Sequence, residues 1–403
     1  MTLKGIEQVP GVLNFDQRAI VLSDPTDVIV TRESFDSSFL DYLEGLGYDF
    51  SQNTFLTHTA SQQTYDSIFN DQKLLRAIQS INAEILDTYH LTSLEEDFAK
   101  KTGKKVFGNI AISDKYGTKS GFRQLALDIG MNVVPGRHNL MNAKELRQGI
   151  LSLKGKTKTV LVRLDEGLSG AGNFLVDLDD FLKKSPSAQN LVAKELLLKL
   201  PQRLSKSGAT AEVWIEDVIS SPSLQYIVYE NGEIELLSSH DQVLEGKEKW
   251  YVGCIYPSVY IIEEILEEGM LFMKTLQKEG FVGYCGLDLI ITPKTYYFVE
   301  ANVRKPGTTY PREFVRKVFG SLQGKYYYAK DIKDSKLIGK TFSEIYAKLI
   351  PLVIKPPISN EGILLYNTGA LKEGGRFDVV VVSPERSHLE TILLEVLGLV
   401  NTL

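Results

Sequence analysis

The sequence predicts a mixed α/β protein built from several lobes. Up to about residue 130, short apolar runs alternate with amphipathic stretches, which is typical of strands in a parallel sheet covered by helices. From about residue 158 the pattern changes to strand pairs joined by short glycine-containing turns, which is typical of β-hairpins. A chain of 403 residues exceeds what one hydrophobic core usually serves, so we expect two to four lobes.

The first 112 residues are expected to form an α/β domain. Residues 19–32 contain two apolar runs separated by Asp24-Pro25, and an amphipathic helix over 34–47 ends at Gly47. Helical pattern continues from residue 62 to 101. The apolar run at 105–112 predicts a buried strand.

A central helical region follows over residues 113–157. We expect a helix at about 115–129, capped by Ser113 or Asp114 and closed by Gly130. Lys115 and Lys119 would then lie one turn apart on the same side of this helix. Basic residues in a first turn oppose the helix dipole, so the two lysines are candidates for phosphate contacts.

Hairpins and helices alternate through the rest of the chain. Strands at 158–165 and 173–178, a helix at about 187–207 and a strand over AEVWIEDVI precede a hairpin whose Asn231-Gly232 turn predicts type I′ geometry. A helix at 261–280 and a hairpin at 286–303 come next. Residues 325–336 are expected to be a connector, and the C-terminal segment predicts strand, strand and helix.

The hairpin at 286–304 carries the most informative polar residues. Glu300 and Asn302 are two apart on a strand, so their side chains leave the same face. A turn centred on Lys294 would place Asp288 opposite Glu300, an arrangement that is repulsive unless a cation lies between them. Carboxylate and amide oxygens suit Mg²⁺. Arg304 continues on that face and could meet a phosphate with its fork of donors.

The alternative for this hairpin is a solvated face on which Asp288, Glu300 and Arg304 form surface ion pairs. The strands are too apolar for a simply exposed hairpin, because they contain Leu287, Leu289, Ile291, Phe298 and Val299.

Two further segments are candidates for nucleotide contacts. Residues 162–173 contain Arg163 followed by a glycine-rich turn. Backbone N–H groups in such a turn can close over phosphates, but an ordinary hairpin loop can have the same composition. Glu216-Asp217 interrupts an apolar run and could read an adenine amino group or a ribose hydroxyl, or could simply solvate a strand end. His240, in an expected polar turn, is interpreted as solvated.

Bulk composition restricts the class of protein. The formal net charge of −6 and the pI of about 5.6 give no general attraction to nucleic acid or anionic membranes. The two cysteines, Cys254 and Cys285, form no disulfide framework and do not have the spacing of zinc ligands. A reducing cytoplasm is therefore the expected compartment. The N-terminus lacks the features of a secretory signal, and no apolar run is long enough to span a membrane.

These pieces, in this order, resemble the ATP-grasp superfamily of ligases over roughly residues 110–320. The resemblance implies an α+β ATP-grasp fold, ATP as co-substrate and two Mg²⁺ ions. It assigns the first nucleotide lysine to Lys115 and the metal ligands to Asp288, Glu300 and Asn302. It assigns the remaining nucleotide contacts to Arg163, to Gly167, Ser169, Gly170, Gly172 and Asn173 in the loop, and to Glu216, Asp217, Val218 and Ile219 in the adenine strand.

The tail EANVRKPGTTYP looks closer still to the pheganomycin-type peptide ligases. That likeness implies a pre-ATP-grasp α/β domain (1–112), a central helical region (113–157), a small lobe with the glycine-rich loop (158–225), a large lobe with the metal site (226–324) and a C-terminal α/β domain (325–403). Two positions depart from the family pattern: Arg163 stands where most members have a lysine, and Ser223 where many have a ribose-binding glutamate.

The resemblance implies an ADP-forming ligase that activates a carboxylate as an acyl phosphate and joins it to an amine, with Lys115 and Arg304 as catalytic residues. Amino acids or peptides are the expected substrates, in peptide or natural-product biosynthesis. Two alternatives stay open: loading of an amino acid onto a carrier protein, and a nucleotide-binding regulatory protein without turnover. The oligomeric state is also left open.

Overall fold

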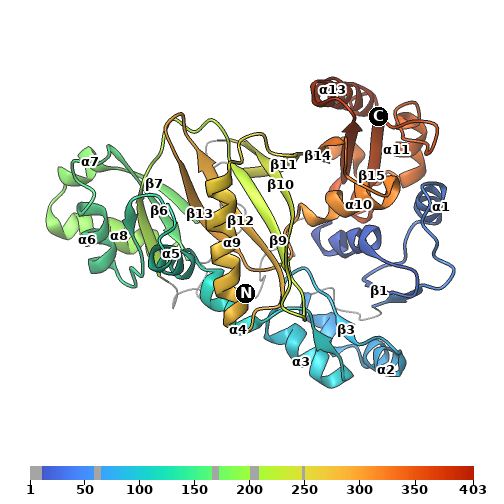
Figure 1. Cartoon of the computed structure of the whole chain (residues 1–403), viewed down its shortest axis with the longest axis horizontal. Coiled ribbons are helices and arrows are strands. Elements are labelled where there is room, and N and C mark those ends of the chain that lie inside the picture. Colours follow the sequence, from blue (N-terminus) through green and yellow to red (C-terminus); the bar gives the residue numbers. More distant parts are fainter. Residues whose placement is uncertain (1–10, 59–64, 166–171, 200–207, 247–249) are drawn as a thin grey trace. The chain divides into compact units, whose positions relative to one another are not determined.

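The computed structural model describes residues 11–58, 65–165, 172–199, 208–246 and 250–403. Its elements, drawn in Figure 1, group into two compact units. The terminal unit comprises residues 1–107, 253–257 and 307–403, and the central unit comprises residues 108–252 and 258–306. Among the described residues, no helix combines the length and apolarity needed to cross a bilayer.

The N-terminal part of the terminal unit alternates helices with short strands. The parallel pairing expected there is confirmed, as two short ladders, β1 with β2 and β3 with β4. The first apolar run of the sequence lies in a 3-10 helix and only the second forms a strand. The elements are η2 (Val12–Leu22), β1 (Val28–Thr31), α1 (Ser37–Gly45), β2 (Thr54–Thr57), η3 (Tyr65–Asn70), α2 (Gln72–Ser80), β3 (Ile85–Leu86), α3 (Ser93–Thr102) and β4 (Lys105–Val106).

The C-terminal part of this unit contains three antiparallel strands in the order β14-β16-β15, with Gly253–Tyr256 of β11 (Trp250–Tyr256) paired to β14. The segment 325–336, expected as a connector, is mostly strand because its tyrosines pack inward: Tyr327 is fully buried. The predicted final strand, strand and helix are confirmed. The elements are α10 (Thr309–Phe319), β14 (Tyr326–Lys333), η5 (Ser335–Leu337), α11 (Phe342–Leu349), β15 (Gly362–Tyr366), η6 (Thr368–Ala370), α12 (Leu371–Gly374), β16 (Arg376–Ser383), η7 (Arg386–His388) and α13 (Leu389–Val400).

The central unit contains two antiparallel sheets. The smaller sheet has the order β5-β8-β6-β7, and helices α6 to α8 pack on it around a core that includes Leu146, Val160, Val162 and Phe181. Its elements are β5 (Gly136–Arg137), α6 (Ala143–Leu151), β6 (Thr159–Leu164), β7 (Asn173–Asp177), α7 (Leu178–Leu182), α8 (Pro186–Leu198) and β8 (Ala209–Val213).

The larger sheet of the central unit has the order β13-β12-β9-β10, with α9 lying along its face in Figure 1. Apolar residues of α4, α5 and α9 meet Leu224, Leu287, Leu289 and Phe298 of this sheet in one buried core. The elements are α4 (Ile110–Tyr116), α5 (Lys119–Asp128), β9 (Pro222–Val228), β10 (Ile234–Glu245), α9 (Glu263–Lys278), β12 (Gly283–Ile291) and β13 (Tyr296–Asn302).

Two expectations about residues 105–129 are wrong, and local capping explains both. The strand predicted over 105–112 is limited to Lys105–Val106, because the Asn109 side chain accepts from the Ile112 N–H and starts α4. The single helix predicted at 115–129 is two helices, since Thr118 caps a second one at Lys119. Lys115 therefore ends α4 while Lys119 begins α5.

The end of one strand, the type of one turn and the burial of His240 also differ from prediction. The strand expected over AEVWIEDVI ends at Val213, and residues 214–219 form a connection outside any strand. The hairpin at Asn231-Gly232 is confirmed, but its turn is not type I′, because only Gly232 has a positive φ of 82° and Tyr229 pairs with Glu233 around a three-residue loop. His240 is not solvated: it lies in β10 and is fully buried.

Candidate functional site

A pair of carboxylates faces each other across the β12–β13 hairpin. Asp288 is the register partner of Glu300, as the sequence predicts. The pairing depends on a β-bulge: Leu289 pairs with Phe298, so Val299 is the extra residue between the two pairs. The turn itself lies at Thr292–Thr295, where the Thr292 N–H donates to the Thr295 carbonyl at 2.8 Å.

Neighbouring side chains hold Asp288 by hydrogen bonds. The Ser223 hydroxyl donates to Asp288 Oδ1 at 2.6 Å, from the strand β9 on the other side of β12. Asn302 Nδ2 donates to Asp288 Oδ2 at 3.0 Å, and Arg304 Nη2 donates to Asn302 Oδ1 at 2.8 Å. Asp288, Asn302 and Arg304 thus form one connected group, and Ser223, the position that departs from the family pattern, contacts Asp288.

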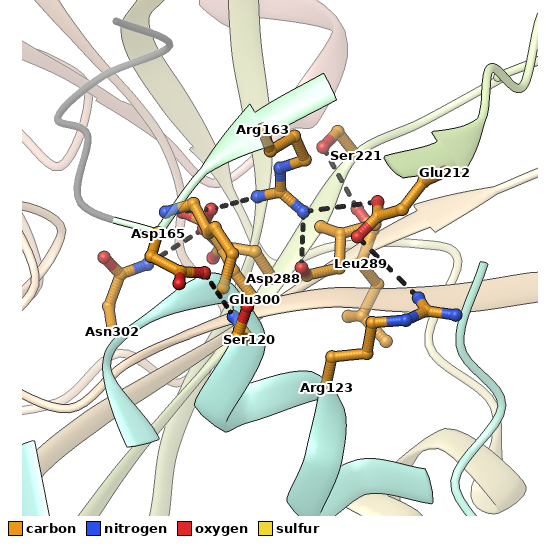
Figure 2. Close-up of polar contacts among 12 residues, drawn as sticks. Ser120, Arg123, Arg163, Asp165, Glu212, Ser221, Asp288, Leu289, Glu300 and Asn302 are labelled. Carbon is orange, nitrogen blue, oxygen red and sulfur yellow. Dashed lines mark hydrogen bonds and ion pairs between the residues drawn. The ribbon is translucent and has the colours of Figure 1, made fainter. Parts of the chain in front are cut away.

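Two cations from other elements contact the second carboxylate. Lys119 Nζ lies 2.8 Å from Glu300 Oε2, and Arg163 Nη2 donates to the same oxygen. Arg163 Nη1 also donates to the Val299 carbonyl at 2.6 Å, which is the carbonyl of the bulged residue. Figure 2 shows the Arg163 guanidinium between Glu300 and Glu212. Arg163 therefore bridges strand β6 of the smaller sheet to strand β13 of the larger one.

The two carboxylates titrate very differently. Burial, together with the nearby Glu300 charge, raises the pKa of Asp288 to about 7, against the Ser223 hydrogen bond and the Arg304 and Lys119 charges. Burial also raises the pKa of Glu300, but Lys119 and Arg163 outweigh it and lower that pKa to about 2. Glu300 is therefore an anion at neutral pH, whereas Asp288 titrates near neutral pH.

This donor set fits Mg²⁺. Asp288 and Glu300 offer carboxylate oxygens and Asn302 an amide oxygen, all hard ligands of the kind that ion prefers. Within the described part of the chain, no three His, Cys, Asp or Glu side chains converge as a metal cage. The three residues would consequently leave coordination positions for water and phosphate oxygens, which is the usual arrangement for Mg²⁺.

The base of the glycine-rich turn is connected to the start of α5. Asp165 accepts from the Ser120 N–H at 2.8 Å through its side chain, and its backbone carbonyl accepts from the Lys119 N–H at 3.3 Å. Asn173 pairs with Arg163 across β6–β7. Gly172 has a φ of 98°, and its carbonyl accepts from the Leu164 N–H at 3.0 Å. Gly167, Ser169 and Gly170 lie outside the described residues.

Residues 216–219 lie in the connection between the two sheets of the central unit. The Trp214 N–H donates to the Thr159 carbonyl of β6 at 3.1 Å, and the Ile219 N–H donates to the Ile291 carbonyl of β12 at 2.8 Å. Between these anchors Glu216, Asp217, Val218 and Ile219 are exposed. The structure thus places the predicted adenine segment on an accessible connection, not inside a strand.

Lys115 is not part of this group. Its ammonium lies 3.1 Å from Glu279 Oε2 in an exposed pair, and it lies over the Tyr116 ring. The Gly117-Thr118 break separates it from Lys119. A Cβ on Gly121 would lie 1.7 Å from the Lys115 carbonyl oxygen, so this close backbone approach requires glycine. Of the two lysines that the sequence singles out, Lys119 is the one beside the carboxylates.

Sequence reasoning missed several residues that hold the site. Glu212 and Arg123 are buried beside Arg163, and Asp165 and Ser120 connect the loop base to α5. Thr118 is a residue type that often caps a helix, so the start of α5 could have been predicted from it. No sequence signal marked Glu212, because its partners come from distant parts of the chain.

Comparison with known proteins agrees with this arrangement. A family model described as a Pre ATP-grasp domain matches residues 16–104, and one described as an ATP-grasp domain matches residues 112–308. Among curated proteins, L-propargylglycine–L-glutamate ligase of Streptantibioticus cattleyicolor is 24% identical over 436 residues, covering 94% of this chain and 88% of that protein.

Solved structures share the fold. The biotin carboxylase domain of the Hydrogenobacter thermophilus 2-oxoglutarate carboxylase, in complex with MgADP, ADP and bicarbonate, matches 94% of this chain and 85% of its own, with a TM-score of 0.62 and 15% identity. The N5-carboxyaminoimidazole ribonucleotide synthetase of Thermus thermophilus matches 96% of each chain, with a TM-score of 0.59 and 14% identity. With its pre-ATP-grasp and ATP-grasp domains in sequence, this chain belongs to the ATP-grasp superfamily.

Proposed function

We propose that the chain is an ATP-dependent carboxylate–amine ligase that activates an amino acid or peptide as an acyl phosphate and releases ADP and phosphate. The observation that carries this proposal is that Asp288 and Glu300 face each other across one hairpin. Three cationic side chains lie around this pair: Lys119, Arg163 and Arg304. Two anions and three cations at one place suit a polyphosphate with its divalent ion.

The nucleotide is assigned to the central unit. Its phosphates lie toward Lys119, Arg163 and the loop that ends at Gly172 and Asn173. We assign the first phosphate contact to Lys119 and not to Lys115, because only Lys119 reaches Glu300, whereas Lys115 pairs with Glu279. Adenine lies against the connection 216–219, whose backbone is anchored at both ends while its side chains stay exposed.

Asp288, Glu300 and Asn302 would hold Mg²⁺ on the phosphates. When bound, the ion neutralises charge that builds up on the transferring phosphoryl group. The protein contributes fixed positions: Ser223 orients Asp288, and Arg304 orients Asn302. In the absence of the ion, Lys119 and Arg163 neutralise the charge of Glu300. When Glu300 binds the ion, both cations are placed to bind phosphate oxygens.

The reaction has two steps. An oxygen of the substrate carboxylate attacks the γ-phosphorus, the bond from that phosphorus to the β,γ-bridging oxygen breaks, and ADP leaves with the electron pair. The substrate amine then attacks the acyl carbon, the bond to the phosphate oxygen breaks, and the amine proton passes to solvent. Arg304, next to the metal ligands, stabilises the charge on the acyl phosphate and on the tetrahedral intermediate.

Amino acids or peptides are the substrate class we favour. The support is the relative named L-propargylglycine–L-glutamate ligase, whose alignment spans most of both chains. Such a pair of substrates places the reaction in the biosynthesis of a peptide or peptide-like natural product.

The test is product analysis with a panel of amino-acid and dipeptide pairs. Nucleotide products are separated by chromatography, and we expect ADP with one equivalent of phosphate per amide bond. AMP and pyrophosphate as the main products would contradict acyl-phosphate chemistry. No ADP release above the background with any pair would contradict ligase function.

A further inference from the structure

Five charged residues form a closed ring inside the central unit. Lys119 contacts Glu300, Glu300 contacts Arg163, Arg163 Nη1 lies 3.7 Å from Glu212 Oε2, and Glu212 Oε1 lies 3.7 Å from Arg123 Nη1. Lys119 and Arg123 are one turn apart on α5, which closes the ring. We call these residues, Lys119, Glu300, Arg163, Glu212 and Arg123, the charge ring; Figure 2 shows four of them.

The inner half of the ring is buried. Arg123, Glu212 and Arg163 have exposed fractions of 5%, 4% and 5%. A buried ion pair is expensive to desolvate and is often no more stable than apolar residues of the same volume. A cluster of three such charges is therefore poorly explained by stability alone, and it calls for a role in placing the residues that it holds.

Strand geometry explains why Glu212 reaches Arg163. Arg163 of β6 pairs with Thr210 of β8, and Glu212 follows two residues later on the same face. The opposite face carries Val162 and Ala211 in the core under α6 and α8. Glu212 lies on the face turned to α5, where Arg123 meets it.

The ring also accounts for an arginine at position 163. Its guanidinium meets three acceptors from two directions: the Val299 carbonyl, Glu300 and Glu212. A planar fork of donors can serve all three at once, whereas a lysine ammonium on a flexible stem cannot hold the same orientation. The departure from the family's lysine is thus matched by Glu212 and by the bulge at Val299.

We propose that Glu212, supported by Arg123, is a positioning residue that fixes Arg163, and through α5 Lys119, for the phosphates of the nucleotide. This inference rests on the proposed function. One carboxylate oxygen of Glu212 pairs with Arg123 and the other with Arg163, so Glu212 acts through these two arginines.

The test is Glu212→Gln, which keeps the volume of the side chain and removes its charge. MgADP affinity is measured by titration calorimetry, and Tm is recorded in parallel. We expect MgADP to bind about tenfold more weakly, because Arg163 loses the partner that orients it. Glu279→Gln, which neutralises the exposed partner of Lys115, is the matched control and should leave the affinity within about twofold.

The direction of the change in MgADP affinity distinguishes a positioning role of Glu212 from a purely electrostatic one. Removing an anion makes the site more positive, so a purely electrostatic role predicts tighter MgADP binding. Tighter binding, or unchanged affinity with a lower Tm, would overturn the proposal. If Glu212→Gln does not fold, Arg123→Gln tests the same support from the side of α5, and an unchanged affinity in that variant would overturn the proposal equally.

A double-variant cycle shows whether Glu212 acts through Arg163. In an Arg163→Lys background, Glu212→Gln should cost less than about twofold in MgADP affinity, because the fork that it orients is already absent. A tenfold loss of MgADP affinity in both backgrounds would contradict the proposal. Binding of MgADP needs no acid or amine, so a wild-type chain that binds MgADP but releases no ADP contradicts the proposed function alone.

Discussion

At the scale of single residues, the two lysines near the α4–α5 break differ in what they contact. Lys119 contacts a half-buried carboxylate, Glu300, and Lys115 contacts an exposed one, Glu279. Lys119→Ala should lower kcat/KM for ATP by about a hundredfold or more, as expected when a charge on a transferring phosphoryl group is lost. Lys115→Ala should stay within about threefold of wild type. Steady-state ADP release checks both variants, and equal losses would restore Lys115 as the phosphate lysine.

Asp288, as the proposed Mg²⁺ ligand, should make metal binding sensitive to pH. Its raised pKa of about 7 means that the folded protein holds a proton there well above the pKa of 3.8 for an unfolded aspartate. Without metal, its contribution to stability is fully present below pH 3.8 and is lost as pH rises to about 7. A cation must displace this proton, so Mg²⁺ should bind about tenfold more weakly for each pH unit below 7.

The measurement is the rise in Tm caused by Mg²⁺ with saturating ADP, taken from pH 5.5 to 8.5. The rise should grow up to about pH 7 and then level off. Glu300, whose pKa is lowered to about 2, stays charged over this whole range and adds no step. A rise that is the same at both ends of the range would contradict the assignment of Asp288 as a metal ligand.

At the scale of elements, the break between α4 and α5 positions Lys119 and depends on Gly121. A Cβ at Gly121 would lie 1.7 Å from the Lys115 carbonyl oxygen and 2.8 Å from the Thr118 hydroxyl that caps α5. Gly121→Ala should therefore destabilise the fold by about 2 kcal/mol or more, through strain and the lost cap. Chemical denaturation gives the free energy of unfolding.

Gly398 is the control for this substitution. It lies inside α13, and a Cβ there would meet nothing within 4 Å. Gly398→Ala should stabilise the protein by about 0.5–1 kcal/mol, because alanine favours a helix and restricts the unfolded chain. A loss for Gly121→Ala no larger than the change at Gly398 would show that the break tolerates a side chain.

Sequence reasoning succeeded where the determinants are local. The two-residue period of strands and one turn predict that Asp288 lies opposite Glu300, and this pairing is confirmed. The turn centre was nevertheless placed half a residue late, and the pairing came out right only because the bulge at Val299 compensates. No sequence signal marks that bulge.

Contacts between distant segments could not be predicted. Arg163 was identified from its place before the glycine-rich turn, but its contacts with Val299 and Glu212 depend on how two sheets meet. The apolar run at 105–112 was interpreted as a strand because periodicity cannot distinguish a short buried strand from a short helix. Capping by Asn109 decided that question.

At the scale of the whole molecule, the two units should respond differently to nucleotide. All residues assigned to MgADP belong to the central unit. Hydrogen exchange with and without MgADP should show added protection in β6, β8, α5 and the β12–β13 hairpin, because a ligand stabilises the state that binds it by about 2.7 kcal/mol at a hundred times its Kd. Strands β15 and β16 of the terminal unit serve as the internal reference. Protection that rises only in those strands would contradict the placement of the nucleotide.

The extra residue in β13 has a consequence for how this hairpin can vary. Phe298 and Ala301 both lie in the core, although they are three positions apart, and Glu300 and Asn302 lie on the opposite face. If Val299 were paired in a regular ladder, the alternation would be unbroken and Glu300 and Asn302 would lie on the same side as Phe298. The bulge thus reverses the parity of the strand midway, so that one half buries aromatic rings while the other presents charge. Because Val299 is the extra residue, its deletion would leave Leu289 opposite Phe298 and Asp288 opposite Glu300 in an unbroken ladder, with Glu300 still on the face opposite Phe298.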